Sequence, residues 1–298
     1  MLPPKITFAI PFYSNLFFLT KAISSVISQT RGDWSCIVLD DAGPNPEAKE
    51  FVEGLKDERI TYYRAKENGG LAVNWNRCLD IPTTELIMLL HADDELKPDF
   101  MAASLEFIAR HPDASGYFCN ADIINEDGHE VFSVPDVVKK FLRPRTQGAL
   151  VVHGDTGLAS IMRGNYIMCP TMIYRRSKLQ ETRFSNKWKM VLDLDLFSLI
   201  LLQGESLIGN PMSLYRYRRH AENQTSKLTT NTVRFVEELN IYDQIGSLAR
   251  GKDWALTAKV CRRKIIIKLN LCYQICQRLI RGRPGETGPF RKLLKEIP

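Results

Sequence analysis

The sequence predicts an α/β protein: a mixed, mostly parallel sheet flanked by helices, with a helical extension at its C-terminal end. Over the first hundred residues, short apolar runs of strand length alternate with helical segments of ~10–15 residues, which implies right-handed crossovers between parallel strands. From residue 229 onward the pattern is helical only. The 44% apolar and 25% charged residues are typical of a globular enzyme, and no apolar window approaches the ~20 residues that span a bilayer.

The elements of the first half follow in order. Residues 6–10 form the first strand, and a helix follows behind a capping Ser14 or Asn15. Residues 35–39 and 60–64 are the next two strands, because they are short, apolar and rich in β-branched or aromatic residues. The helices are predicted from Asn45 and Pro46 to Leu55, and after the pair Gly69 and Gly70.

The stretch 85–98 combines a buried strand with a group of acidic residues. Residues 86–90 are continuously apolar, and His91, Asp93, Asp94 and Glu95 follow before Pro98, where a helix could begin. In open α/β sheets this strand edge is where ligands bind, and carboxylates massed there repel one another unless Mg²⁺ or Mn²⁺ neutralises them. The alternative is a solvated acidic turn that caps the next helix.

Two other strands end in residues that suit a nucleotide. The first ends in Pro11-Phe-Tyr13 and the second in Asp40-Asp41. The ends of parallel strands share one rim, so Tyr13 can lie against a base and Asp41 can accept a hydrogen bond from a base or ribose. Taken singly, Tyr13 is equally a packing residue and Asp41 a turn former.

Several classes of protein are excluded or disfavoured. The first strand is not followed by a glycine-rich phosphate loop or by G-x-G-x-x-G, which argues against a sugar nucleotidyltransferase and an ordinary dinucleotide fold. Seven cysteines without C-x-x-C spacing indicate buried free thiols in a reducing compartment. Residues 1–14 lack the features of a signal peptide, and the net charge of +6 is modest. We therefore expect a cytoplasmic protein without a nucleic-acid partner.

An ordered set of motifs carries a family resemblance. The motifs are Ile6-Thr-Phe-Ala-Ile-Pro-Phe-Tyr13, the helix Ala22-Ile-Ser-Ser-Val-Ile-Ser-Gln-Thr30, Trp34-Ser-Cys-Ile-Val-Leu-Asp-Asp41, Glu67-Asn-Gly-Gly70, Asn74-Trp-Asn-Arg77 and Leu90-His-Ala-Asp-Asp94. Together they resemble the family 2 glycosyltransferases, which have the GT-A fold, in register over roughly the first hundred residues and more weakly to Ser226. The resemblance implies inverting transfer of a sugar from a nucleotide diphosphate sugar, most commonly a UDP-sugar, with Mg²⁺ or Mn²⁺ bridging the diphosphate.

The resemblance also divides the chain. Residues 1–226 would form the GT-A domain, with the nucleotide sugar bound by 1–124 and the acceptor by 125–226. Residues 227–298 would form the helical C-terminal extension.

Residue roles follow from the resemblance. Asp93 and Asp94 would serve the ribose and the metal, with His220 as a further metal ligand. Two positions depart from the family pattern. His91 replaces the first carboxylate of the usual D-x-D and is either a ligand, which would suit Mn²⁺ better than Mg²⁺, or a donor to a ligand. Trp75 stands where relatives often carry an arginine. The implied donor contacts are Pro11, Tyr13, Asp41, Asn76, Arg77, Asp93 and Arg219.

The catalytic base is expected in the segment 191–200, which resembles a family helix that begins with Glu-Asp. The aligned residue is Asp193, and Asp195 lies about 200° away on a helix, so both cannot face one cleft. Leu192 replaces the usual Glu, and its apolar side chain would raise the pKa of Asp193. The alternative is that both carboxylates only favour the positive helix N-terminus.

The middle of the chain would supply the acceptor side. Residues 116–124 form a strand, and 164–176 resemble the family segment that lines the acceptor cleft. Residues 134–152 are irregular and basic, either a solvated loop or a mobile lid over an anionic substrate. A strand pair at 206–208 and 213–217 precedes Arg218 and Arg219, either of which could offset charge on the leaving group. His153 is expected to be structural, and His220 is either a ligand or an exposed loop residue.

The C-terminal extension is basic and amphipathic. Residues 254–285 contain eight Lys and Arg and no acidic residue. Such a helix can lie on an anionic membrane surface, at the inner face of the membrane, or it can cap the catalytic domain or form a homodimer. Its apolar residues, which recur at helical spacing as one stripe, are Ala258, Cys261, Ile265, Leu269, Cys272, Cys276 and Leu279.

The sequence thus predicts a metal-dependent glycosyltransferase of the hexosyltransferase type. Its acceptor would be a hydroxyl of a glycan or a lipid-linked molecule in cell-surface polysaccharide synthesis. A catalytically silent nucleotide-sugar-binding or assembly subunit remains the second hypothesis.

Overall fold

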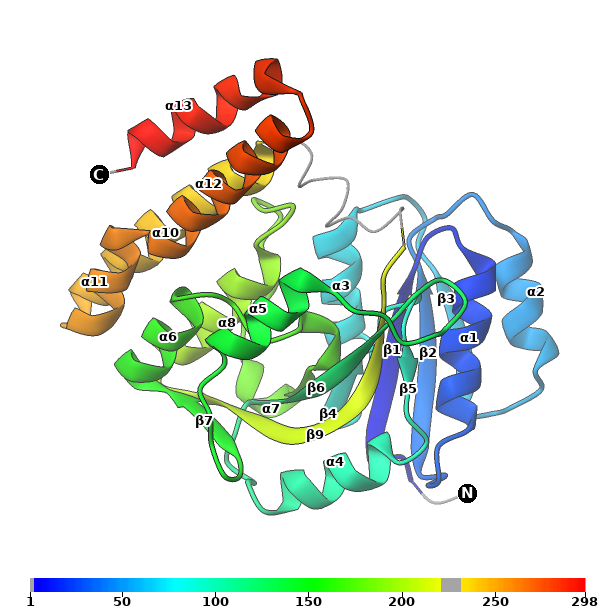
Figure 1. Cartoon of the computed structure of the whole chain (residues 1–298). Helices are drawn as coiled ribbons and strands as arrows, with labels where there is room; N and C mark the ends of the chain where they lie inside the picture. Colours follow the sequence, from blue (N-terminus) through cyan, green and yellow to red (C-terminus); the bar gives the residue numbers. More distant parts are fainter. Residues whose placement is uncertain (1–2, 221–231, 298) are drawn as a thin grey trace.

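The protein folds around one nine-stranded sheet. The structure is a computed structural model and describes residues 3–220 and 232–297 (Figure 1). The strand order is β3-β2-β1-β4-β8-β6-β9-β5, and β7 pairs with β9 beside this path. The predicted α/β class with a mixed, mostly parallel sheet is confirmed, because the parallel strands of the first half continue into a second half of mixed pairing.

The first half matches the predicted order of elements. Its strands pair in parallel, and Asn15 caps the first helix by accepting a hydrogen bond from the Phe18 N–H at 3.1 Å. The strands are β1 (Ile6–Phe12), β2 (Trp34–Asp40), β3 (Ile60–Arg64) and β4 (Leu86–Leu89). The helices are α1 (Leu16–Ile27), α2 (Glu47–Gly54), α3 (Leu71–Asp80) and α4 (Phe100–Ala109).

The second half adds antiparallel pairing. Strand β8 runs antiparallel to both β4 and β6, whereas β9 runs parallel to β6 and antiparallel to β5 and β7. These strands are β5 (Glu95–Leu96), β6 (Gly116–Ile124), β7 (Leu150–His153), β8 (Ile173–Arg175) and β9 (Ser206–Arg218).

Two predictions for this half are wrong. The predicted strand pair at 206–208 and 213–217 is the single strand β9, whose register against β6 shifts around Asn120. Pro211 has no N–H to donate, and the irregularity accommodates it while Asn120 donates to its carbonyl at 2.6 Å. The predicted irregular segment 134–152 contains helix α5 (Val134–Leu142), which begins with a proline in its first turn, and strand β7.

Helices cover both faces of the sheet. Helices α1, α2 and α4 pack on one face, and α3 packs on the other with the later helices. The later elements are α6 (Gly154–Met162), the 3₁₀ turn Cys169–Thr171, α7 (Arg176–Leu179) and α8 (Leu192–Leu202). The C-terminal ones are α10 (Val233–Gly251), α11 (Ala255–Arg263), α12 (Ile265–Ile280), the 3₁₀ turn Pro284–Thr287 and α13 (Gly288–Glu296).

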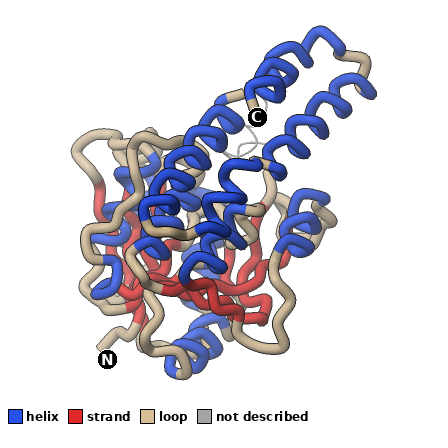
Figure 2. Tube along the Cα trace, turned by 90° about the vertical axis from the view of Figure 1, so that its left-hand side faces the viewer, coloured by secondary structure: helices blue, strands red, loops and turns tan. Residues whose placement is uncertain are grey.

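The C-terminal helices project from the body of the protein but share its core (Figure 2). Phe235, Ile241 and Leu271 belong to the same buried cluster as Ala9 and Leu39 of the sheet. The predicted boundary between 226 and 227 lies outside the described residues.

The cysteine prediction holds for five of the seven thiols. All seven are free, and five are buried, but Cys272 and Cys276 are exposed on α12. In the described part of the chain, no helix combines the length and apolar character that crossing a membrane requires.

Candidate functional site

The carboxyl ends of the parallel strands open into one large cavity. Its volume is about 1540 Å³, and its wall includes Asp41, Asp93 and Asp193, which come from three segments far apart in the sequence. Pro11 and Tyr13 at the end of β1 also line it, and the Tyr13 side chain is 50% exposed. The predicted nucleoside contacts and the predicted base therefore share one space, although their roles remain predictions.

The two aspartates after β2 differ in environment. Asp40 is fully buried and holds the turn, accepting from the Gly43 N–H at 2.7 Å and from Tyr62 and Arg64. Asp41 faces the cavity but also accepts from the N–H groups of Gly69 and Gly70, each at 2.8 Å, and from Arg77 at 2.5 Å. A carboxylate has about four acceptor positions, so Asp41 is held in place and retains roughly one for a nucleoside donor group.

The predicted contacts of Asn76 and Arg77 with the donor are not supported. Neither residue lines the cavity. The Asn76 amide pairs with the Phe184 main chain, at 2.9 Å to its carbonyl and 2.8 Å from its N–H. Arg77 forms an ion pair with Asp41. Successive helical residues point about 100° apart, so the face of α3 that meets the cavity carries Asn74 and Trp75 instead.

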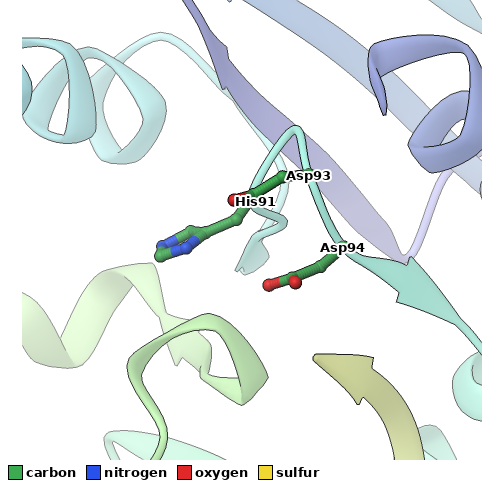
Figure 3. Close-up of side chains that lie close together, drawn as sticks. All are labelled: His91, Asp93 and Asp94. Carbon is green, nitrogen blue, oxygen red and sulfur yellow. The ribbon is translucent and has the colours of Figure 1, made fainter. Parts of the chain in front are cut away.

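The turn after β4 brings His91, Asp93 and Asp94 together. One ligand atom from each lies within 4.8 Å of the others, and Figure 3 shows His91 and Asp94 projecting to the same side of the turn. The His91 ring packs on Trp75 with centroids 5.0 Å apart, and its buried Nε2 has no hydrogen-bond partner among residues 3–220 and 232–297. Burial lowers the pKa of His91 against the opposing charge of Asp93, so the imidazole is neutral, the form that binds metals.

Asp93 and His220 form a pair at the cavity wall. The His220 Nε2 lies 2.9 Å from Asp93 Oδ2, and both residues line the cavity. Burial opposes ionisation of Asp93, but the hydrogen bond with His220 favours the carboxylate, and the pKa of Asp93 is lowered. The ring of His220 also packs on Phe18, at 4.8 Å between centroids. His220 is therefore not an exposed loop residue.

Asp94 is less available than the sequence predicts. It is fully buried and does not line the cavity, and its two oxygens accept from the Tyr215 hydroxyl at 2.9 Å and the Arg218 N–H at 2.7 Å. Burial, followed by the charge of Asp93, raises the pKa of Asp94 well above its usual value. These bonds tie β9 to the turn, and a carboxylate oxygen of Asp94 still lies within 4.8 Å of the ligand atoms of His91 and Asp93, so its role as a metal ligand stays a prediction.

The adjacent arginines also differ. Arg218 is buried, donates to the carbonyls of Asp93 and Asn125 at 2.8 Å and pairs with Glu95. Arg219 lines the cavity and stacks on Tyr217 at 5.3 Å. Of the two candidates for offsetting charge on a leaving group, the geometry brings only Arg219 to the cavity.

The residues of this turn fit a divalent cation. The neutral imidazole of His91 has a buried nitrogen without a hydrogen-bond partner in the described part of the chain, and it lies near the carboxylate of Asp93. His220 and Asp94 lie beside them. Oxygen ligands suit Mg²⁺ and Mn²⁺, and an imidazole shifts the preference toward Mn²⁺.

Helix α8 separates its two acidic residues as predicted. Asp193 lines the cavity, where it accepts from the Asn165 amide and the Leu194 N–H at 2.9 and 2.8 Å. Burial raises the pKa of Asp193, in the predicted direction, against the opposing charge of Lys139 and these hydrogen bonds. Asp195 is 2% exposed, lies off the cavity and contacts Gln244 at 3.3 Å.

Sequence reasoning missed the far wall of the cavity. Helices α5 and α12 build it, although the first was expected to be irregular and the second was treated as peripheral. A signal was present, because amide residues recur at helical spacing on α12 as Asn270, Gln274 and Gln277.

Comparisons with known sequences agree with this geometry. Residues 7–183 match the family described as Glycosyl transferase family 2. The succinoglycan biosynthesis protein ExoW of Rhizobium meliloti is 29% identical over 201 residues, which are 65% of this chain and 62% of that protein. The putative teichuronic acid biosynthesis glycosyltransferase TuaG of Bacillus subtilis is 27% identical over 126 residues, 42% of this chain and 50% of that protein. The chain thus spans less than two thirds of these relatives.

Solved structures share the fold. The S. aureus protein TarS (residues 1–349), in complex with UDP-GlcNAc, superposes with a TM-score of 0.70 at 16% identity, over 99% of this chain and 82% of that one. The mannosyltransferase PcManGT of Pyrobaculum calidifontis, in complex with GDP-Man and Mn²⁺, gives a TM-score of 0.58 at 14% identity, over 99% and 84% of the two chains.

Proposed function

The chain belongs to glycosyl transferase family 2, and from this premise we propose that it is an inverting, metal-dependent glycosyltransferase. It would move a sugar from a nucleotide diphosphate sugar, UDP-linked in the first instance, to a hydroxyl of a glycan or lipid-linked acceptor. One observation carries this proposal: Asp41, Asp93 and Asp193 line a single cavity large enough for a donor and part of an acceptor.

The donor is proposed to lie along the sheet edge. Tyr13 offers a half-exposed ring for the base, and the carboxylate of Asp41, held by Gly69 and Gly70, accepts from the nucleoside. Asp93 with His91 and His220 would hold the divalent cation, which neutralises the diphosphate when bound. Arg219 supplies further positive charge toward the departing nucleotide.

Asp193 is proposed as the general base. It would take the proton from the acceptor hydroxyl as that oxygen attacks the anomeric carbon opposite the departing diphosphate, which inverts the configuration. Burial raises the pKa of Asp193, which makes its carboxylate a better proton acceptor than an ordinary one. Asn165 fixes one carboxylate oxygen and the Leu194 N–H the other, so the side chain is oriented before substrate arrives.

The biological role proposed is synthesis of a cell-surface polysaccharide. The relatives are named for succinoglycan, teichuronic acid and, in Escherichia coli, colanic acid biosynthesis. We place the protein in the cytoplasm, on the inner face of the membrane. Phe141 on α5 and Ile280 on α12 are 75% and 86% exposed, and Arg262 and Arg263 add positive charge.

Vesicle flotation tests the membrane contact. The protein should float with anionic vesicles and not with neutral ones, and Phe141→Asp or Ile280→Asp should weaken flotation, because each adds a negative charge to an apolar contact. Equal flotation of wild type and both variants would show that Phe141 and Ile280 do not contact the membrane.

Donor binding and donor hydrolysis test the main proposal. Thermal shift with UDP, GDP and dTDP in Mn²⁺ should single out one nucleotide, because a ligand at 100 times its Kd stabilises by about 2.7 kcal/mol. Slow, metal-dependent hydrolysis of the matching nucleotide sugar without acceptor indicates a transferase. Binding without hydrolysis, and without transfer to any acceptor supplied, would instead indicate the silent binding subunit.

A further inference from the structure

One face of α12 forms a wall of the cavity, although the family match ends at residue 183. The side chains on this face recur at three- and four-residue spacing and extend along about 22 Å of helix from Ile266 to Arg281. Their character changes along the helix, from aliphatic to aromatic and amide to cationic. In order they are Leu269, Asn270, Tyr273, Gln274, Gln277 and Arg281.

The aliphatic end of this face adjoins the proposed base. A Cβ added to Gly164 would collide with Leu142 of α5 and lie 3.7 Å from Ile266 of α12, so both helices meet over Gly164. The next residue is Asn165, which hydrogen-bonds Asp193 at 2.9 Å. The wall therefore begins beside the group that activates the acceptor, rather than beside the nucleoside contacts.

The middle of the wall carries groups suited to a carbohydrate. Tyr273 is 48% exposed, and its hydroxyl accepts from the Gln277 amide. Arg278 donates to the Gln274 Oε1 at 2.7 Å and packs on Phe290 at 3.9 Å. These contacts order the aromatic ring and the amides along one line, and such amides can both donate to and accept from hydroxyl groups.

The far end of the wall is cationic. Arg278, Arg281 and Arg283 lie there together with the acidic residue Glu286, which is 4.0 Å from Arg278 and 3.8 Å from Arg283. Arg281 is exposed, and among residues 3–220 and 232–297 no ion pair is formed by it. Guanidinium groups bind carboxylates and phosphates through paired hydrogen bonds.

We propose that this face of α12 is the acceptor subsite and that it binds an extended, anionic acceptor, with its attacking hydroxyl at Asp193 and a carboxylate, phosphate or diphosphate at Arg281. Glycan hydroxyls between these ends meet the amides and the Tyr273 ring. The proposal rests on the proposed function, which it deepens by naming the acceptor as charged and elongated. The anionic group comes either from the glycan itself or from a lipid diphosphate that carries it.

Calorimetry on the full chain tests the subsite and separates the two sources. The probes are a hexasaccharide of guluronate, farnesyl diphosphate and neutral maltohexaose, each titrated into protein that holds UDP and Mn²⁺. At least one anionic probe should bind and maltohexaose should bind more weakly. A preference for the guluronate chain assigns the charge to the glycan, and a preference for farnesyl diphosphate assigns it to a lipid diphosphate.

Matched variants connect this binding to α12. Arg281→Ala should weaken the anionic probe about tenfold, the loss expected for one charged hydrogen bond. Tyr273→Ala should weaken the affinity for the guluronate hexasaccharide. Arg291→Ala, which removes an exposed arginine of α13 that does not line the cavity, should leave the affinity unchanged. UDP affinity should be unchanged in all three variants.

Several results would overturn the subsite. They are failure of both anionic probes to bind, equal losses from Arg281→Ala and Arg291→Ala, loss of UDP affinity in Arg281→Ala, or binding to anionic vesicles alone. The proposed function is judged separately, because it fails if the protein neither hydrolyses a nucleotide sugar nor transfers its sugar, whatever the acceptor probes do.

Discussion

The two sides of the cavity are built differently. On the donor side, Asp40, Asp41 and Asp94 accept hydrogen bonds from their own chain, so the carboxylates are fixed before any ligand arrives. On the acceptor side, Asp193 has one side-chain donor, Asn165, and the wall opposite comes from α5 and α12. Asp41 and Asp93 lie within the family match, whereas Asp193 and α12 lie beyond it. The acceptor side therefore depends more than the donor carboxylates do on residues outside the matched segment.

The largest effect is expected at the base. Asp193→Asn should lower turnover by about 10²–10⁴-fold, the usual contribution of a general base, while UDP affinity stays the same. The measurement is initial rate with saturating donor and acceptor, alongside UDP titration.

Asp195→Asn is the matched control two residues along α8. Because Asp195 lies off the cavity, its turnover should remain close to wild type. If the two variants lost the same activity, Asp193 would have no special role and the acceptor side would lack its base.

Removal of the metal tests the donor side. EDTA should abolish donor hydrolysis and Mn²⁺ should restore it, and Asp93→Asn should cost about 10²-fold or more in rate, because the diphosphate charge is then poorly neutralised. Asp99→Asn changes an exposed aspartate nearby and should have no effect. Full activity of Asp93→Asn in EDTA would show that donor binding does not use this turn.

The pH dependence of transfer should report the acceptor side. Because burial raises the pKa of Asp193, the acid limb of kcat should lie above the pH of an ordinary carboxyl group, with about tenfold loss per pH unit below it. Lys139 lowers the pKa of Asp193, so Lys139→Met should move this limb to higher pH. The same change at the exposed neighbouring lysine, Lys140→Met, should leave the acid limb in place. A shift of the limb to lower pH in Lys139→Met would contradict the assignment of Asp193 as the base.

The smallest effect is expected on the free energy of unfolding, at the contact between α10 and the segment that precedes α8. The Glu237 carboxylate of α10 accepts from the Lys189 N–H at 3.0 Å and the Met190 N–H at 2.8 Å, just before α8. Glu237→Gln weakens these charged hydrogen bonds and should cost about 1–3 kcal/mol of unfolding free energy, measured in urea. The exposed Glu296→Gln serves as control. Unchanged stability would mean that α10 is not anchored there.

Much of the donor side could be predicted from the sequence. Residues 86–90 and the acidic residues after them give the strand and its functional edge directly, because a buried parallel strand and a charged turn have distinct compositions. The direction of the pKa shift at Asp193 also followed from its apolar neighbour. These inferences depend on contacts that are local in the sequence.

The errors arose where distant contacts decide. Asn76 has the residue type of a donor contact, but its amide pairs with the Phe184 main chain, and both oxygens of Asp94 accept hydrogen bonds from β9. The local sequence does not reveal those partners. Helix α5 and the unbroken strand β9 were also missed, and each contains a proline that the fold accommodates: one lies in the first turn of the helix, and the other sits where the strand register shifts.

The position of α12 in the chain has a consequence for synthesis. A ribosome adding ~5–20 residues per second makes Asp93 roughly 10–35 s before Ile265, the first residue of the cavity-lining helix. The strands and loops that hold a nucleotide can therefore take shape while the helical wall is still unmade. We expect a nascent chain to recognise its sugar donor before it can choose where the sugar goes.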